Sequence, residues 1–73
     1  MTIHSTAAQK IRDAEKAREE LRTALNWAGI TLPSLSLDAV SLAGNYPRPL
    51  VDLGRCAPEV ARQLAVALRK SPT

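Results

Sequence analysis

TAAQKIRDAEKAREELRTALNWAG, residues 6–29, is the longest stretch of the chain with a regular pattern, and it decides the fold. Thr6 is followed three residues later by Gln9, which predicts a capping box that starts a helix. Gly29 suits the left-handed conformation that ends a helix, and Ile30 is placed to fold back onto the last turn. The stretch is therefore predicted to be one long helix with a marked start and a marked end.

A heptad stripe runs along one side of this helix, because its members are spaced by alternating steps of four and three residues. The stripe is interrupted by one charged side chain, and its members are Ala7, Ile11, Ala14, Arg18, Leu21, Leu25 and Ala28. In a small domain such a stripe most often packs on the protein's own core. The sharper interpretation is that it joins two copies of the chain as a parallel or antiparallel helix pair.

The two halves of the stripe differ in apolar mass, which divides the helix at Arg18. We expect the C-terminal half, with Leu21 and Leu25, to pack on the core, and Trp27 to cover the core edge. The N-terminal half carries mostly small apolar residues and is expected to project or to pair. The dimer interface is predicted to comprise Ala7, Ile11, Ala14, Arg18, Leu21 and Leu25.

After the long helix, the sequence alternates apolar and polar residues as short strands do. Leu35 and Leu37 fit the apolar face of one half-buried strand. Val40 and Leu42 have the opposite parity, so we expect either a bulge near Ala39 or two separate extended pieces.

A turn signal separates this strand from a second one. Gly44-Asn45 favours a turn, and the two prolines that follow it exclude a regular helix and a central strand. Leu50–Leu53 is predicted to pair back as a hairpin, which must lie against the helices because two strands alone are not stable. The alternative is a short helix over Asp38–Ala43, closed by Gly44, which would make the chain all-α with three helices.

A second helix is predicted from Pro58 to Lys70. Proline is favoured at the first helical position, Glu59 complements the positive N-terminal end, and Arg69 and Lys70 complement the C-terminal end. The apolar face of this helix comprises Val60, Ala61, Leu64, Ala67 and Leu68. The sequence thus predicts an α+β fold, a small helix–strand–strand–helix domain with a long N-terminal helix.

A single domain is predicted for residues 1–73, with frayed termini at 1–5 and 71–73. A chain this short buries only about 60% of the surface that its unfolded form exposes, so its core is marginal without help. Cys56 is the sole cysteine and His4 the sole histidine, which excludes an intrachain disulfide and a Cys/His zinc site. Self-association is the stabilising device that remains.

A cytoplasmic location is expected from the lone thiol and from the lack of an apolar run long enough for a signal peptide or a membrane span. We also expect no enzyme activity and no cofactor, because the sequence has neither a Ser-His-Asp arrangement nor a glycine-rich phosphate loop. Cys56 is interpreted as a small half-buried residue that supports the start of the second helix. A nucleophilic role would require a neighbouring base, and none accompanies Cys56.

A net charge of +3 and a sequence pI of about 9.6 permit an acidic partner such as nucleic acid. Residues 52–64, DLGRCAPEVARQL, resemble the turn and the start of the recognition helix in helix-turn-helix DNA-binding proteins. The sequence departs from that family's pattern where its first helix would be interrupted by prolines. The resemblance implies that the exposed side chains of the second helix face DNA, and the candidate nucleic-acid contacts are Arg55, Arg62 and Arg69.

Two functions follow from these patterns. The leading hypothesis is a small non-enzymatic regulator or adaptor that binds another protein and acts as a dimer through its N-terminal helix. The alternative is a DNA-binding protein with a degenerate helix-turn-helix around residues 50–69. The partner itself is not named by any motif.

Overall fold

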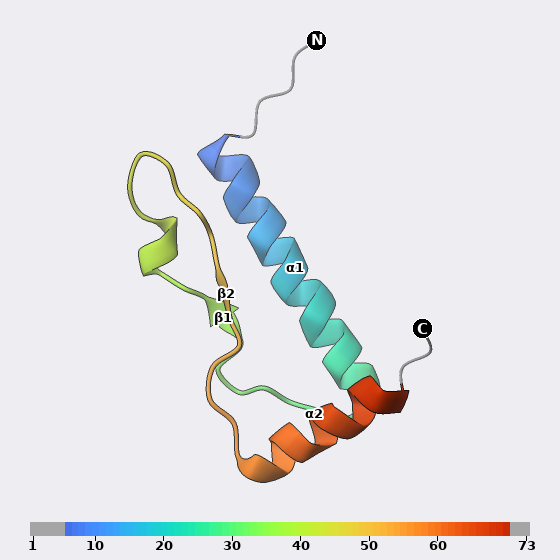
Figure 1. Cartoon of the computed structure of the whole chain (residues 1–73). Coiled ribbons are helices and arrows are strands. Elements are labelled where there is room, and N and C mark those ends of the chain that lie inside the picture. Colours follow the sequence, from blue (N-terminus) through green and yellow to red (C-terminus); the bar gives the residue numbers. More distant parts are fainter. Residues whose placement is uncertain (1–5, 71–73) are drawn as a thin grey trace.

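The chain folds in the predicted helix–strand–strand–helix order, which Figure 1 shows from end to end. The computed structural model describes residues 6–70, so the predicted frayed termini and His4 lie outside the described residues. The elements are α1 (Ala7–Trp27), β1 (Ser36–Leu37), a 3-10 turn η1 (Val40–Leu42), β2 (Val51–Asp52) and α2 (Pro58–Lys70). The α+β prediction is therefore confirmed, in preference to the all-α alternative.

Local interactions fix both ends of α1 as the sequence predicts. The Gln9 amide donates to Thr6 Oγ1 at 3.1 Å and the Thr6 amide donates to Gln9 Oε1 at 2.9 Å, which completes the capping box. At the other end Gly29 has a positive φ of 73°, and the Ile30 amide donates to the Leu25 carbonyl at 2.8 Å. This fold-back carries Ile30 into the core, where it is 2% exposed.

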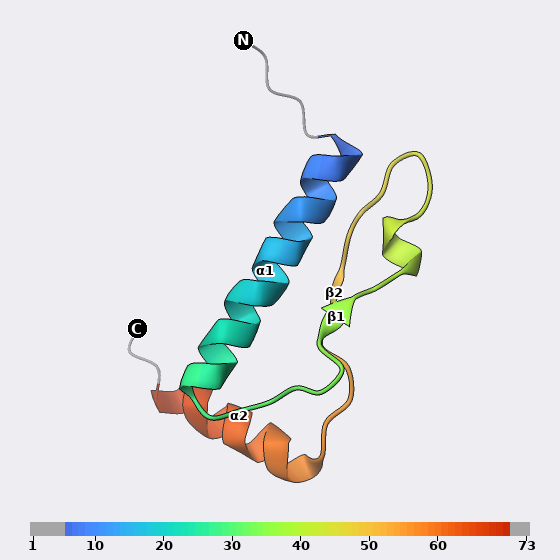
Figure 2. The ribbon, with the colours of Figure 1, turned by 180° about the vertical axis from the view of Figure 1, so that it is seen from behind.

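The strands are shorter than predicted, and they form an antiparallel pair in which Leu37 lies opposite Val51. Two residues per strand give few hydrogen bonds, so the pair depends on α1 for support. Figure 2 shows the hairpin lying along α1, with its loop beside the N-terminal half of the helix. The Arg22 guanidinium donates to the Leu35 carbonyl at 3.2 Å, which ties α1 to the entry of the hairpin.

The segment between the strands contains the short helix that the sequence left as an alternative, reduced to the single 3-10 turn η1. The expected bulge near Ala39 is wrong, because Ala39 has helical dihedral angles and starts this turn. Ser41 Oγ donates to the Asp38 carbonyl at 2.6 Å and accepts from the Leu50 amide at 2.9 Å. A non-local hydrogen bond thus selects the turn, and Gly44 closes it with a φ of 93°.

Gly54 directs the chain from β2 toward α2. Its φ is 74°, and a Cβ atom at this position would lie 2.4 Å from the Cβ atom of Ser34. The Gly54 amide also donates to Asp52 Oδ1 at 2.8 Å. The segment that leaves the hairpin at Gly54 therefore crosses the segment that enters it at Ser34. The two segments lie so close together that a residue larger than glycine does not fit at position 54.

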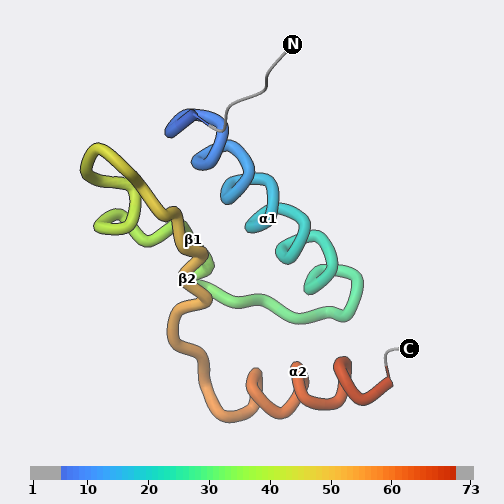
Figure 3. The backbone as a smooth tube through the Cα atoms, turned by 45° about the horizontal axis from the view of Figure 1, so that its top comes forward, coloured from blue at the N-terminus to red at the C-terminus, as the bar shows by residue number. Residues whose placement is uncertain are grey.

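The second helix lies across the C-terminal end of α1, as Figures 1 and 3 show, and closes a small core. The centre of this core consists of Leu25, Ile30 and Leu35, each at most 6% exposed. Half-buried side chains surround it: Leu21, Leu32, Val51, Val60, Leu64 and Ala67. α2 contributes three of these and no buried residue, so its attachment is weak.

The shape of the molecule reflects this small core. Its Cα radius of gyration is 14.9 Å, whereas a compact domain of this length has about 11 Å. Within residues 6–70, seven large apolar side chains are exposed, namely Trp27, Val40, Tyr46, Leu50, Leu53, Val66 and Leu68. The fold therefore leaves apolar surface uncovered in several places.

Candidate interaction surface

The heptad stripe of α1 faces the chain's own hairpin and core. Ala14 and Leu25 are buried, Ile11, Arg18 and Leu21 are half-buried, and Ala7 is exposed. The expectation that the N-terminal half projects is wrong at its centre, because Ala14 is buried. The stripe thus packs on the protein's own core, as the first interpretation has it. Its buried members are not accessible to a partner in this structure.

Trp27 is exposed, contrary to the expectation that it covers the core edge. Its exposed fraction is 88%. The reason is geometric, since two residues along an α-helix turn the side chain by about 200° from Leu25, which faces the core. Sequence reasoning placed Trp27 by its proximity to the stripe and overlooked this rotation.

A shallow hollow of about 490 Å³ runs along the outer face of α1 next to Trp27. One part of the hollow is lined by Thr23, Ala24 and Trp27. The rest is lined by the charged residues Lys16, Glu19 and Glu20. Glu19 takes part in ion pairs with Arg22 and with Arg18, the latter at 3.1 Å.

Two arginines keep Glu19 charged. Desolvation acts to raise the pKa of the Glu19 carboxyl, but hydrogen bonds and the positive charges of Arg22 and Arg18 together hold that pKa below its ordinary value. The Glu19 carboxylate is therefore held along α1 by the two arginines, and it stays ionised to lower pH than an unpaired glutamate does. Glu20 is exposed and has no ion-pair partner within residues 6–70.

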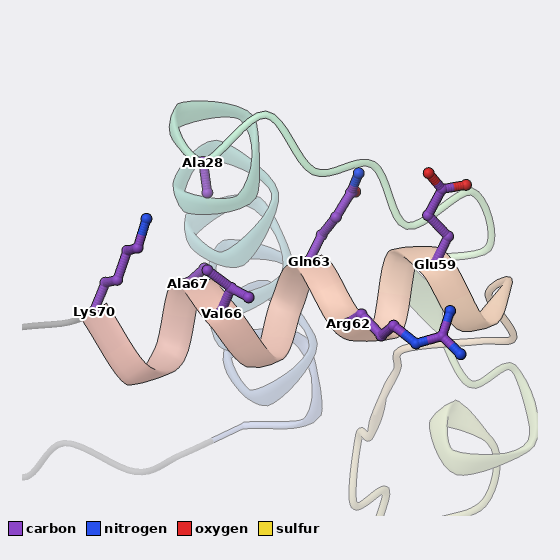
Figure 4. A pocket seen from close by; sticks show the side chains of 7 residues that line it. All are labelled: Ala28, Glu59, Arg62, Gln63, Val66, Ala67 and Lys70. Atoms are coloured by element: carbon purple, nitrogen blue, oxygen red, sulfur yellow. The ribbon is translucent and has the colours of Figure 1, made fainter.

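A second concavity, which we call the α1–α2 groove, lies where α2 passes the end of α1 (Figure 4). Its volume is about 540 Å³. The apolar floor is formed by Ala28 from the end of α1 and by Val66 and Ala67 from α2. Polar side chains border this floor along α2, namely Glu59, Arg62, Gln63 and Lys70.

Trp27 borders the hollow on the outer face of α1, whereas Ala28, the next residue, is rotated from it by about 100° and lines the groove. Val66, which is exposed, was missed by sequence reasoning because it lies outside the predicted apolar face of α2. No sequence signal identifies the groove itself, since its walls come from two helices whose relative placement depends on the loops.

The three arginines proposed to contact nucleic acid are all exposed. Arg62 borders the α1–α2 groove, Arg69 lies in the last turn of α2, and Arg55 precedes the helix. The element before the turn is β2 and not a helix, so the part of the chain that the structure describes does not reproduce the two helices of a helix-turn-helix.

The remaining candidates offer no defined chemistry. Cys56 is exposed, and the expectation of a half-buried residue is wrong. Within residues 6–70, no three His, Cys, Asp or Glu side chains gather closely enough to hold a metal ion. Neither α1 nor α2 combines the length and the apolar character needed to cross a lipid bilayer. The chain matches no protein-family model, no curated protein and no solved structure.

Proposed function

We propose that this protein is a non-enzymatic interaction protein that acts as a dimer, with α1 supplying the main contact. The observation that carries the proposal is the exposure of Trp27, which the chain's own fold leaves uncovered. Tryptophan is among the residues most enriched at the energetic centres of protein interfaces. A large aromatic side chain that is 88% exposed is the kind of group that such a centre requires.

The energetics of the fold favour the same function. α2 has no buried residue, and the apolar centre of the domain holds three side chains. A chain of this length has little stability to spare, and a partner that binds only the folded form adds stability by mass action. Covering the end of α1 and the adjacent side of α2 would therefore strengthen the attachment of the second helix.

The contact is proposed to lie beside the heptad stripe and not on its buried members. Leu25 and Ala14 are buried within the chain, whereas Ala24 and Trp27 on the neighbouring side of the same helix are exposed. The role of the N-terminal helix in association is thus retained, and the residues assigned to it change.

The proposal is tested by measuring the mass of the full chain in solution. Sedimentation equilibrium from low micromolar to several hundred micromolar protein should show a reversible shift from one copy to two. Circular dichroism at each concentration should show the same helical content, because association joins folded chains. A chain that remains monomeric over the whole range would overturn the dimer.

A further inference from the structure

We infer that α2 acts as a latch on the core: it detaches and unfolds as one unit while α1 and the hairpin stay folded. The opening takes place within a single chain, so it does not depend on the proposed dimer. It gives the domain two states, a closed state in which α2 covers the core and an open state in which the core is uncovered on that side.

Apolar contacts alone hold α2 on the rest of the domain. Val60, Leu64 and Ala67 form a stripe along the helix at spacings of four and three residues, and they pack on the core cluster. None of the three is buried. Within residues 6–70, no hydrogen bond or ion pair joins a residue of α2 to α1, β1 or β2. Detachment of α2 therefore breaks no polar contact.

The rest of the domain keeps its own contacts when α2 leaves. Six of the nine side chains of the core cluster belong to α1, to β2 or to the segment between α1 and β1. The hydrogen bond from Arg22 to the Leu35 carbonyl and the one from the Leu50 amide to Ser41 Oγ both lie outside α2. α1 and the hairpin can therefore remain joined in the open state.

A short exposed segment, residues 55–57, separates the two parts. Gly54 before it is held by its close approach to Ser34 and by the hydrogen bond to Asp52. All three residues of the segment are exposed, and the hydrogen bond that the structure gives them runs from the Ala61 amide to the Ala57 carbonyl, inside the first turn of α2. The chain can therefore change direction after Gly54 without disturbing the hairpin.

The length of α2 makes its opening cooperative. The helix has 13 residues, and isolated helices shorter than about 12–15 residues are marginal in water. Once it leaves the core, α2 therefore unfolds along its whole length. A segment of this kind opens with a smaller free energy than the domain as a whole.

Hydrogen exchange of the full chain, followed by mass spectrometry at low micromolar concentration, measures the opening of each element. Amides in the middle of α2, residues 64–67, should exchange about tenfold or more faster than the slowest amides of α1, after correction for intrinsic rates. Their exchange should also depend less on added urea, because detaching one helix exposes less surface than unfolding the whole domain does.

Two leucine substitutions in α2 test the contact that keeps the latch closed. Leu64→Ala removes a half-buried side chain from the core cluster, and it should speed exchange of the α2 amides about tenfold further. Leu68→Ala is the matched control, because it makes the same chemical change in the same helix at a side chain that is 68% exposed. It should change the exchange rates by about twofold or less.

Three outcomes would overturn the latch. The first is one free energy of opening and one urea dependence for α1 and α2, which would show that the domain opens only as a whole. The second is an equal effect of Leu64→Ala and Leu68→Ala, and the third is a complete lack of protection in α2 of the native chain. A chain that stays monomeric in sedimentation would remove the dimer and leave the latch in place.

Discussion

Replacing Gly54 by alanine tests how the two loops at the base of the hairpin hold the fold together. The new Cβ atom would lie 2.4 Å from the Cβ atom of Ser34 and 3.1 Å from its carbonyl carbon and oxygen. Gly29 provides a matched control, because its φ of 73° equals that of Gly54 within a degree and its Cβ would meet nothing within 4 Å. The two substitutions therefore share the backbone penalty and differ in the steric overlap.

The magnitudes follow from these distances. A non-glycine residue in the left-handed region costs about 1–2 kcal/mol, which is the whole expected effect of Gly29→Ala. At Gly54 the two loops must also separate by about 1 Å, and overpacking of this kind adds about 1–3 kcal/mol. A domain of 73 residues has a free energy of unfolding of about 4–11 kcal/mol, so Gly54→Ala removes a large part of it.

Urea unfolding followed by circular dichroism measures both free energies, at a protein concentration low enough that association does not contribute. Gly54→Ala should be less stable than Gly29→Ala, with a melting temperature lower by about 4–8 °C for each additional kcal/mol. Removing the opposing side chain with Ser34→Gly in the Gly54→Ala background should recover part of the loss. Equal destabilisation by the two alanine substitutions, or no recovery in the double variant, would refute the role assigned to this crossing.

Three further predictions concern the loop, the helix start and the arginines. Ser41→Ala should lower the free energy of unfolding by about 1 kcal/mol and speed hydrogen exchange at the Leu50 amide, which loses its acceptor. Thr6→Ala should cost about 0.5–2 kcal/mol through loss of the cap, seen as a lower urea midpoint. Because β2, and not a helix, precedes α2 within residues 6–70, duplex DNA at low salt should retain the native chain and an Arg62→Ala, Arg69→Ala variant equally. Salt-sensitive retention that is lost in the variant would favour the DNA-binding alternative.

The parts of the fold that the sequence predicts correctly are those that local interactions determine. The capping box at Thr6 and the fold-back after Gly29 involve residues no more than five positions apart, so their geometry can be inferred from residue type. The start of α2 at Pro58 follows the same logic. Apolar periodicity then gives the order of the elements and hence the α+β class.

Prediction fails where a distant residue decides between local alternatives. The sequence of residues 38–42 is compatible with a bulged strand and with a short helix. The hydroxyl of Ser41 favours the turn because the Leu50 amide, nine positions away, lies within hydrogen-bonding distance of it. The groove is undetermined for the same reason, since its shape depends on where α2 crosses α1. That placement is set in part by the contact between Gly54 and Ser34, which are twenty positions apart.

The exposure of Trp27 had a signal in the sequence that a stricter use of helical geometry recovers. Leu25 and Trp27 cannot both face the core when successive residues are rotated by about 100°. An apolar residue that lies off the core-facing stripe is either a scattered surface residue or part of a contact, and its neighbours decide between the two. Here the neighbour is Ala28, whose methyl group lines a groove, which a helical projection of α1 alone does not reveal.

α2 links the stability of the domain to the proposed dimer. One side of this helix packs on the core through Val60 and Leu64, which are only half-buried, and another side supplies Val66 to the groove. A partner that covers the groove would contact α2 and the end of α1 at once, and so oppose their separation. By thermodynamic linkage, whatever favours attachment of α2 must then favour association to the same extent. The small core and the exposed tryptophan are, on this proposal, two aspects of one equilibrium: the domain gains through its partner the burial that its own length does not supply.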